Sequence, residues 1–288
     1  MVNIKENSKP HPQIHIHRHE QVHYVDWPVK NALALTTTRH HPFNIDKNTY
    51  KSTTGKTFPT SPFQSFNLGL HVGDDKQTVL NNRNDLIKLL PPHSKIQWLE
   101  QIHAADVVTV TQHSEIPIIT DAAITQTKGI ALAVMTADCL PIILSSKDGD
   151  EVAAIHGGWR PLAANIIANT LNKMQTASTD IVAWLGPCIG NEAFEVGEEV
   201  KHTFVEHSPL FAQAFIPSFI KKTNLETLKP IKEKYVADLS MIASIQLKHL
   251  GINTICSLNH CTYQTKGEYY SYRRDGKTGR MATIICRT

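Results

Sequence analysis

Three residues with metal-binding side chains each lie at or just after the end of a short apolar run, and they are His103, Cys139 and His156. Neutral imidazole and thiolate are ligands that zinc favours, and three protein ligands leave one tetrahedral position open, as in catalytic zinc sites. The residues are too far apart in the chain for a zinc-finger knuckle. Because open α/β sheets gather their sites at strand ends, we expect the three side chains to meet through tertiary folding.

The same residues are compatible with other chemistry. Two imidazoles and one thiolate also suit a blue-copper centre, with Met135 as a distant axial ligand. Cys139 could instead be a nucleophile that His103 or His156 activates. An inert core thiol beside two strand-end histidines is a further interpretation. Spacing alone leaves these alternatives open.

Composition excludes several classes of protein. The chain has 288 residues, and 29 basic against 26 acidic residues give a net charge of +3. The basic residues are scattered, so no electrostatic footprint for nucleic acid is present. The most apolar stretch, Ile130 to Leu144, is too short for a membrane span and contains Asp138. The N-terminus lacks the apolar core of a signal peptide, so we expect a cytoplasmic protein with its five cysteines as thiols.

Strands and helices are expected in mixed order along the chain. Hydrophobic spacing predicts helices at 79–90, from Pro161 to 174, at 195–207 and after an N-cap at Asp238. Apolar runs predict strands at 32–36, 96–99, 107–110, 130–135, 140–144, 152–155, 181–185, 254–258, 269–273 and 283–286. With no repeat and no clear linker, this mixture indicates one α/β domain.

The first 25 residues are polar and contain His11, His15, His17, His19 and His23. We expect residues 1–25 to be a mobile extension without a catalytic role, and residues 26–288 to be a single catalytic domain. Residues 45–62, rich in Thr, Ser, Lys and Pro, are expected to form a long surface loop.

Seven segments resemble one known family in content and in order. They are SFNLG at 65–69, WLEQIH at 98–103, TADCLP at 136–141, HGGWR at 156–160, WLGPCIG at 184–190, FEVG at 194–197 and SYRRD at 271–275. From about Ala32 to the C-terminus the sequence resembles the laccase-domain family. That family is also called the polyphenol oxidase family or peptidoglycan editing factor, and its members are described as purine nucleoside phosphorylases.

The resemblance implies a fold, a metal and an activity. The implied fold is a single-domain four-layer αββα sandwich with mixed sheets, and the implied cofactor is Zn²⁺ at His103, Cys139 and His156, with copper the less favoured metal. The implied reactions are phosphorolysis of adenosine, inosine and S-methyl-5'-thioadenosine, and deamination of adenosine. The partners would be nucleoside and phosphate, not nucleic acid or membrane, for a monomer or weak homodimer. The chain departs from the family pattern at Ala104, at Gly157 with Pro161, and at His40–His41.

Five further residues are candidates for supporting roles. Asp138, next to Cys139, could orient a ligand or move a proton, or could pair structurally with an arginine. Arg160 precedes the predicted helix, where its guanidinium and free backbone N–H groups would attract phosphate, or it could form a structural ion pair. Arg39, Asn67 and Arg83 are candidates for binding substrate or phosphate.

Two other functions compete with the phosphorylase. A cysteine- or zinc-dependent amidase that edits peptidoglycan precursors would use Cys139 as nucleophile or as ligand. A copper polyphenol oxidase, or laccase, would need a three-copper cluster with several His-x-His pairs. The sequence offers this pattern only at residues 15–19.

Overall fold

The computed structural model describes residues 21–43, 61–218 and 233–288. Most of the histidine-rich N-terminus and most of the expected loop at 45–62 therefore lie outside the described residues. Val22–Tyr24 forms strand β1, which pairs antiparallel with β2 (Ala32–Thr37). The last part of the expected extension therefore includes a paired strand, in which Val22 is buried.

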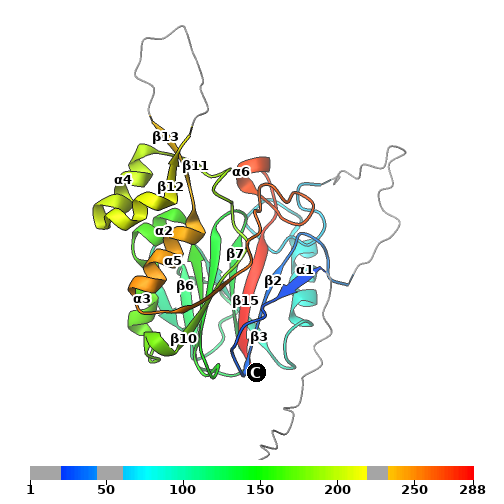
Figure 1. Ribbon diagram of the computed structural model, residues 1–288. Helices are drawn as coiled ribbons and strands as arrows, with labels where there is room; N and C mark the ends of the chain where they lie inside the picture. Colours follow the sequence, from blue (N-terminus) through cyan, green and yellow to red (C-terminus); the bar gives the residue numbers. More distant parts are fainter. Residues whose placement is uncertain (1–20, 44–60, 219–232) are drawn as a thin grey trace, which may run out of the picture.

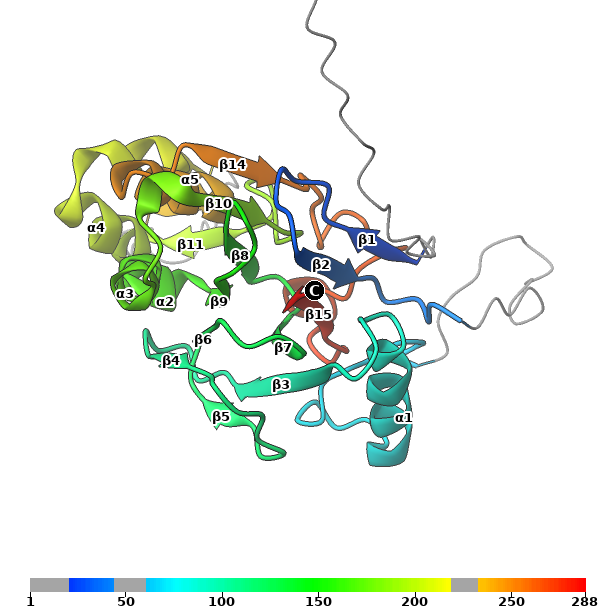
Figure 2. The same cartoon turned by 90° about the horizontal axis from the view of Figure 1, so that it is seen from below.

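Two six-stranded sheets, each with parallel and antiparallel pairs, form the centre of the molecule (Figures 1 and 2). The first has the order β1-β2-β15-β7-β3-β5, with β3 (Lys95–Glu100), β5 (Ile118–Ile119), β7 (Ile130–Thr136) and β15 (Met281–Arg287). The second has the order β14-β10-β8-β9-β6-β4, with β4 (Val107–Thr109), β6 (Ala122–Thr125), β8 (Leu140–Ser146), β9 (Val152–Gly157), β10 (Ile181–Leu185) and β14 (Thr254–Ser257). Consecutive strands β7 and β8 lie in different sheets, so the turn between them crosses from one sheet to the other.

The sheets pack face to face, and helices cover their outer faces. Leu132 in β7 and Ile143 in β8 belong to the core between the sheets. Ala131 and Ala133 of β7 point the other way and pack with Leu86 of α1 (Lys76–Ile87). A separate core joins the second sheet to α2 (Trp159–Ala163), α3 (Ile166–Lys173) and α5 (Leu239–His249). The alternation of side chains along fully buried strands therefore builds the four-layer αββα sandwich that was expected.

A small third sheet lies beside the second one. Its order is β11-β13-β12, with β11 (Glu195–Gly197), β12 (Phe215–Pro217) and β13 (Lys234–Ala237), and it packs with α4 (Glu198–His207) and the 3₁₀ helix η2 (Pro209–Ala214). Another 3₁₀ helix, η1 (Ser178–Asp180), precedes β10. The predicted N-cap of α5 is confirmed, because the Asp238 carboxylate accepts a hydrogen bond from the N–H of Met241. No helix within the described residues is both long and apolar enough to span a membrane.

Three local predictions are wrong. The expected helix from Pro161 to 174 begins at Trp159 and is divided, since Asn165 adopts a left-handed conformation (φ 62°) between α2 and α3. The helix expected from 195 starts only at Glu198, after β11. The strand expected at 269–273 is instead a loop that enters α6 (Tyr272–Asp275), whose first turn is capped by Ser271.

Candidate metal centre and its cavity

The three predicted metal ligands meet at the junction of the two sheets. His103 follows β3, Cys139 lies in the turn that crosses from β7 to β8, and His156 lies in β9. Their ligand atoms lie within 4.8 Å of one another, and Cys139 Sγ is 3.9 Å from His103 Nε2. Two such ligands on one tetrahedral zinc ion would be about 3.6 Å apart. The geometry therefore fits a metal ion after a small contraction.

A buried carboxylate that the sequence analysis missed holds two of these ligands. Asp121 Oδ1 accepts hydrogen bonds from His156 Nδ1 at 2.7 Å and from the N–H of His103 at 3.0 Å. Its Oδ2 accepts from the N–H groups of Ala104 and Ile102. Because Nδ1 of His156 donates to Asp121, its Nε2 is left with a free lone pair for a metal. No motif marks Asp121, since its role arises only where the segments before β4 and β6 meet.

The backbone around the ligands is strained and fixed by side chains. His103 (φ 61°) and Asp138 (φ 100°) adopt left-handed conformations that are uncommon for residues other than glycine. The Gln101 amide accepts from the N–H of Met135 and donates to its carbonyl, which fastens the end of β3 to β7. At Gly158, an added Cβ would lie 3.3 Å from Cys139 Sγ. Such strain is concentrated at functional sites when surrounding contacts maintain it.

The electrostatics of the cluster favour a thiolate. Burial opposes ionisation of Cys139, but the imidazoles of His156 and His103 outweigh it and lower the pKa of the thiol. Burial also opposes protonation of His156, but Cys139 and Asp121 outweigh it and raise the pKa of the imidazole. Burial raises the pKa of Asp121, yet its hydrogen bonds, that from His156 first, lower it overall. A thiolate is the form of cysteine that binds metals.

The ligands line a cavity of about 740 Å³ that also contains positive charge. Trp98, Leu99 and Ile102 contribute apolar surface to its walls. Arg83 and Arg280 contribute guanidinium groups, and no ion pair links either one to a carboxylate within the described ranges. A buried cation without a counter-ion is costly, so the cavity is suited to an anionic ligand.

Both arginines are held by neighbouring groups. Arg83 Nε donates to the carbonyl of Leu68 at 2.9 Å, and its guanidinium lies 3.8 Å from the centre of the Trp98 ring. Burial lowers the pKa of Arg83 to about 10, so it remains charged at neutral pH. Burial also lowers the pKa of Arg280, an effect that Cys139 and Asp138 partly offset. Arg280 was not a sequence candidate, whereas Arg83 was, and the cavity contains both.

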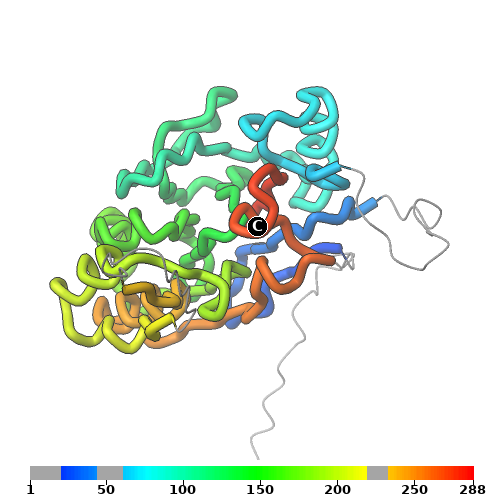
Figure 3. The backbone as a smooth tube through the Cα atoms, turned by 90° about the horizontal axis from the view of Figure 1, so that it is seen from above, coloured from blue at the N-terminus to red at the C-terminus, as the bar shows by residue number. Residues whose placement is uncertain are grey.

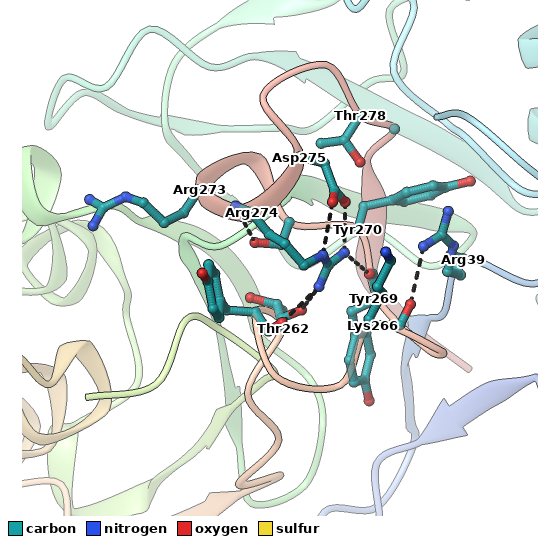
Figure 4. A network of polar contacts seen from close by, with 12 residues as sticks. Arg39, Thr262, Lys266, Tyr269, Tyr270, Arg273, Arg274, Asp275 and Thr278 are labelled. Atoms are coloured by element: carbon teal, nitrogen blue, oxygen red, sulfur yellow. Dashed lines mark hydrogen bonds and ion pairs between the residues drawn. The ribbon is translucent and has the colours of Figure 1, made fainter. Parts of the chain in front are cut away.

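Asn67 and Arg39 do not line the cavity. The fully buried Asn67 accepts hydrogen bonds at Oδ1 from the N–H groups of Gly69 and Arg280, so it positions the backbone of Arg280. Arg39 lies over the Tyr270 ring and donates to the carbonyls of Gln64 and Lys266 (Figure 4). Their contacts within the described chain are structural, and substrate contact by either side chain is not supported.

Asp138 and Arg160 also lie outside the set of cavity residues. The Asp138 carboxylate accepts from the Thr262 hydroxyl at 2.7 Å and from the N–H of Arg273 at 2.6 Å, which ties the crossing turn to α6. In Figure 3 the C-terminal part of the chain, which contains α6 and is drawn in red, lies next to the green middle part of the chain. Arg160 is exposed and stacks on Trp159 within the five-residue helix α2. The expected phosphate site at the start of that helix is therefore not supported.

Comparisons with known proteins agree with this architecture. A protein of Escherichia coli (strain K12) named purine nucleoside phosphorylase YfiH is 39% identical over 224 residues, which cover 78% of this chain and 87% of that protein. A purine nucleoside phosphorylase of Haemophilus influenzae is 39% identical over 246 residues, covering 84% and 96%. A solved structure from Neisseria meningitidis matches with a TM-score of 0.79 and 34% identity, covering 93% of this chain and 99% of that one. A family model described as multi-copper polyphenol oxidoreductase laccase matches residues 49–288, so the chain belongs to that family.

Proposed function

We propose that this protein is a zinc-dependent purine nucleoside phosphorylase that acts on adenosine, inosine and S-methyl-5'-thioadenosine and that also deaminates adenosine. The observation that carries the proposal is one cavity that joins the His103–Cys139–His156 cluster to the buried Arg83 and the half-buried Arg280, neither of which pairs with a carboxylate within the described chain. Relatives at 39% identity are named purine nucleoside phosphorylase. The expected location is the cytoplasm.

Zinc fits the three side chains by donor type and by distance. Two imidazoles and a thiolate are favoured zinc ligands, and Asp121 supplies the hydrogen bond that fixes the ligating face of His156. When bound there, zinc would supply Lewis-acid chemistry to a substrate in the cavity. The residues of the chain then have the tasks of holding the ligands in place and of positioning the nucleoside and phosphate.

Phosphate is assigned to Arg83 and Arg280. In phosphorolysis a phosphate oxygen forms a bond to C1' of the ribose while the bond from C1' to the purine breaks, and the base leaves with a proton. Guanidinium groups bind phosphate oxygens through paired N–H donors. Arg280 also lies near enough to Cys139 for their charges to interact, so a phosphate bound by Arg280 would lie beside the metal ligands. The apolar surface of Leu99 and Ile102 is available to the nucleoside.

Product analysis tests this proposal. Purified protein incubated with adenosine and phosphate should release adenine and ribose 1-phosphate, and without phosphate it should release inosine and ammonia. The products of both reactions should be separated by chromatography, and their amounts should be compared with those from protein treated with a metal chelator. Release of neither set of products by zinc-loaded protein would overturn the proposal.

A cysteine amidase is the second candidate, because one observation favours it. His156 joins the Cys139 thiol, whose pKa it lowers, to the carboxylate of Asp121, as in a Cys-His-Asp triad. A triad enzyme keeps its activity when a chelator removes metal, whereas a zinc enzyme loses it. Cleavage of an amide in a peptidoglycan precursor by metal-free protein would therefore favour the amidase.

A copper oxidase is less well supported. Met135 lines the cavity, but its sulfur accepts a contact from Arg83 Nη2 at 3.6 Å. Within the described chain, one cluster of His103, Cys139 and His156 and one of His23, His260 and Glu268 could hold metal. Neither has the several paired histidines of a three-copper centre. Metal analysis that finds copper, with oxidation of a phenol, would instead support the oxidase.

A further inference from the structure

A second group of metal-binding side chains lies outside the cavity of Cys139. His23 is the middle residue of β1, His260 follows β14, and Glu268 lies in the turn before Tyr269. One candidate ligand atom from each lies within 4.8 Å of the others, and none of the three lines that cavity. The group therefore cannot be explained as part of the proposed active site.

Two atoms of this group lack the partners that buried polar atoms normally have. His23 Nε2 and Glu268 Oε2 are both inaccessible to solvent and make no hydrogen bond. They face one another at 3.7 Å, which is too long for a hydrogen bond. Unpaired buried polar atoms are rare in native proteins, and each calls for a ligand, an ion or a water. One cation between the imidazole and the carboxylate would satisfy both atoms.

The distances fit one ion as well as those of the first cluster do. His23 Nε2 and His260 Nδ1 lie 3.7 Å and 3.8 Å from Glu268 Oε2. A nitrogen and an oxygen on one tetrahedral zinc ion would be about 3.4 Å apart. The contraction needed is about the same as in the first cluster. There, Cys139 Sγ and His103 Nε2 are 3.9 Å apart, and on one zinc ion they would be about 3.6 Å apart.

The surrounding structure holds the three residues in place. His23 is fixed by the pairing of β1 with β2, opposite Thr36. The carbonyl of Glu268 accepts from the N–H of Arg39 at 2.7 Å. Arg274 donates to the carbonyls of Thr262, Tyr263 and Tyr269 and so fastens the loop that carries Glu268 (Figure 4). A site that is already ordered loses little conformational entropy when it binds an ion.

The hydroxyl of Tyr269, which follows Glu268 in the chain, also lies at this site. The Tyr269 hydroxyl lies 2.8 Å from His260 Nδ1. A phenol hydroxyl is a hydrogen-bond donor, and it can turn to the nearby Glu268 carboxylate when His260 binds an ion.

We propose that His23, His260 and Glu268 bind a second divalent transition-metal ion, with zinc the best match to two imidazoles and one carboxylate. The ion joins β1, at the edge of the first sheet, to the loop after β14, at the edge of the second. This site does not depend on the proposed enzymatic activity. Its expected effect is to stabilise the attachment of the N-terminal strand.

The test counts metal in full-length variants. The reference protein carries His11, His15, His17 and His19 replaced by Asn, so that these N-terminal histidines cannot contribute. In this background His260→Ala and Glu268→Gln remove or weaken the site, and His202→Ala is the matched control, since His202 contacts Glu206 at 3.3 Å outside either metal cluster. Each protein is dialysed against buffered zinc, its fold is checked by circular dichroism, and bound zinc is measured by mass spectrometry.

We expect two equivalents of zinc in the reference and in His202→Ala, one fewer in His260→Ala, and at least tenfold weaker binding at the second site in Glu268→Gln. Cobalt titration distinguishes the two sites, because only the Cys139 site gives a thiolate-to-cobalt absorption band. In Cys139→Ala this band should disappear while one equivalent of cobalt still binds. Adding Glu268→Gln to Cys139→Ala should weaken the binding of that equivalent at least tenfold. Unchanged zinc content and affinity in both His260→Ala and Glu268→Gln would overturn the site. If His260→Ala does not fold, Glu268→Gln decides alone.

Discussion

Replacement of Asp121 by Asn tests how the metal ligands are held. In the native protein, four hydrogen-bond donors converge on this buried carboxylate, two on each oxygen. An amide keeps one oxygen and presents an N–H₂ group to the other pair of donors. Each buried donor left unpaired costs about 1–3 kcal/mol, so the free energy of unfolding should fall by about 2–6 kcal/mol. Loss of the negative charge on the far side of His156 should weaken zinc binding by about 10- to 100-fold, or about 1.4–2.7 kcal/mol.

The assay is a competition for zinc between the protein and a chromophoric chelator, at a temperature where every variant is folded. Asp106→Asn is the matched control, because Asp106 is exposed and only its backbone carbonyl makes hydrogen bonds among the described residues. We expect unchanged affinity in the control and a loss in Asp121→Asn. A folded Asp121→Asn protein with native zinc affinity would refute the assignment of Asp121 as the residue that orients the ligands.

Three further predictions concern phosphate and the N-terminus. Arg280→Met should raise the KM for phosphate at least about tenfold in steady-state kinetics, which corresponds to about 1.4 kcal/mol of lost binding free energy, whereas Arg160→Met should leave this KM unchanged. The opposite pattern would show that phosphate binds at α2. Asn67→Ala should lower the free energy of unfolding by about 1–3 kcal/mol and also raise the KM for phosphate, because Asn67 positions the backbone of Arg280. An unchanged KM would show that Asn67 has no effect on phosphate binding by Arg280. Deletion of residues 1–20 should leave turnover nearly unchanged, whereas deletion through residue 24 removes β1 and should lower the melting temperature; equal melting temperatures would show that β1 contributes nothing.

Local patterns predicted an α/β fold and candidate ligands, whereas the resemblance to a known family implied the four-layer arrangement and the metal site. Buried strands such as β7 stand out as apolar runs, and His103, Cys139 and His156 are the right ligand types at strand ends. The motif around Asn67 was found, but its role was not, because its hydrogen bond to Arg280 joins residues at opposite ends of the chain.

Other features depend on tertiary contacts that no local pattern reveals. Asp121 has no motif, and its four donors come from two separate segments. Pro161 indicated a helix in this region, but the helix begins at Trp159 and the chain turns at Asn165, so α2 has only five residues. The apolar and aromatic residues at 269–273 suggested a strand, yet Tyr269 and Tyr270 are buried in a loop core beside Met281.

The most direct test of the central claim is to measure zinc content and phosphorolysis together in Cys139→Ala, with Cys256→Ala as the control. Cys256 lies in β14 and does not line the cavity. If the His103–Cys139–His156 cluster holds the ion that phosphorolysis requires, Cys139→Ala should lose one equivalent of zinc and its release of adenine from adenosine, while Cys256→Ala keeps both. Full zinc content with native phosphorolysis in a folded Cys139→Ala protein would contradict the account.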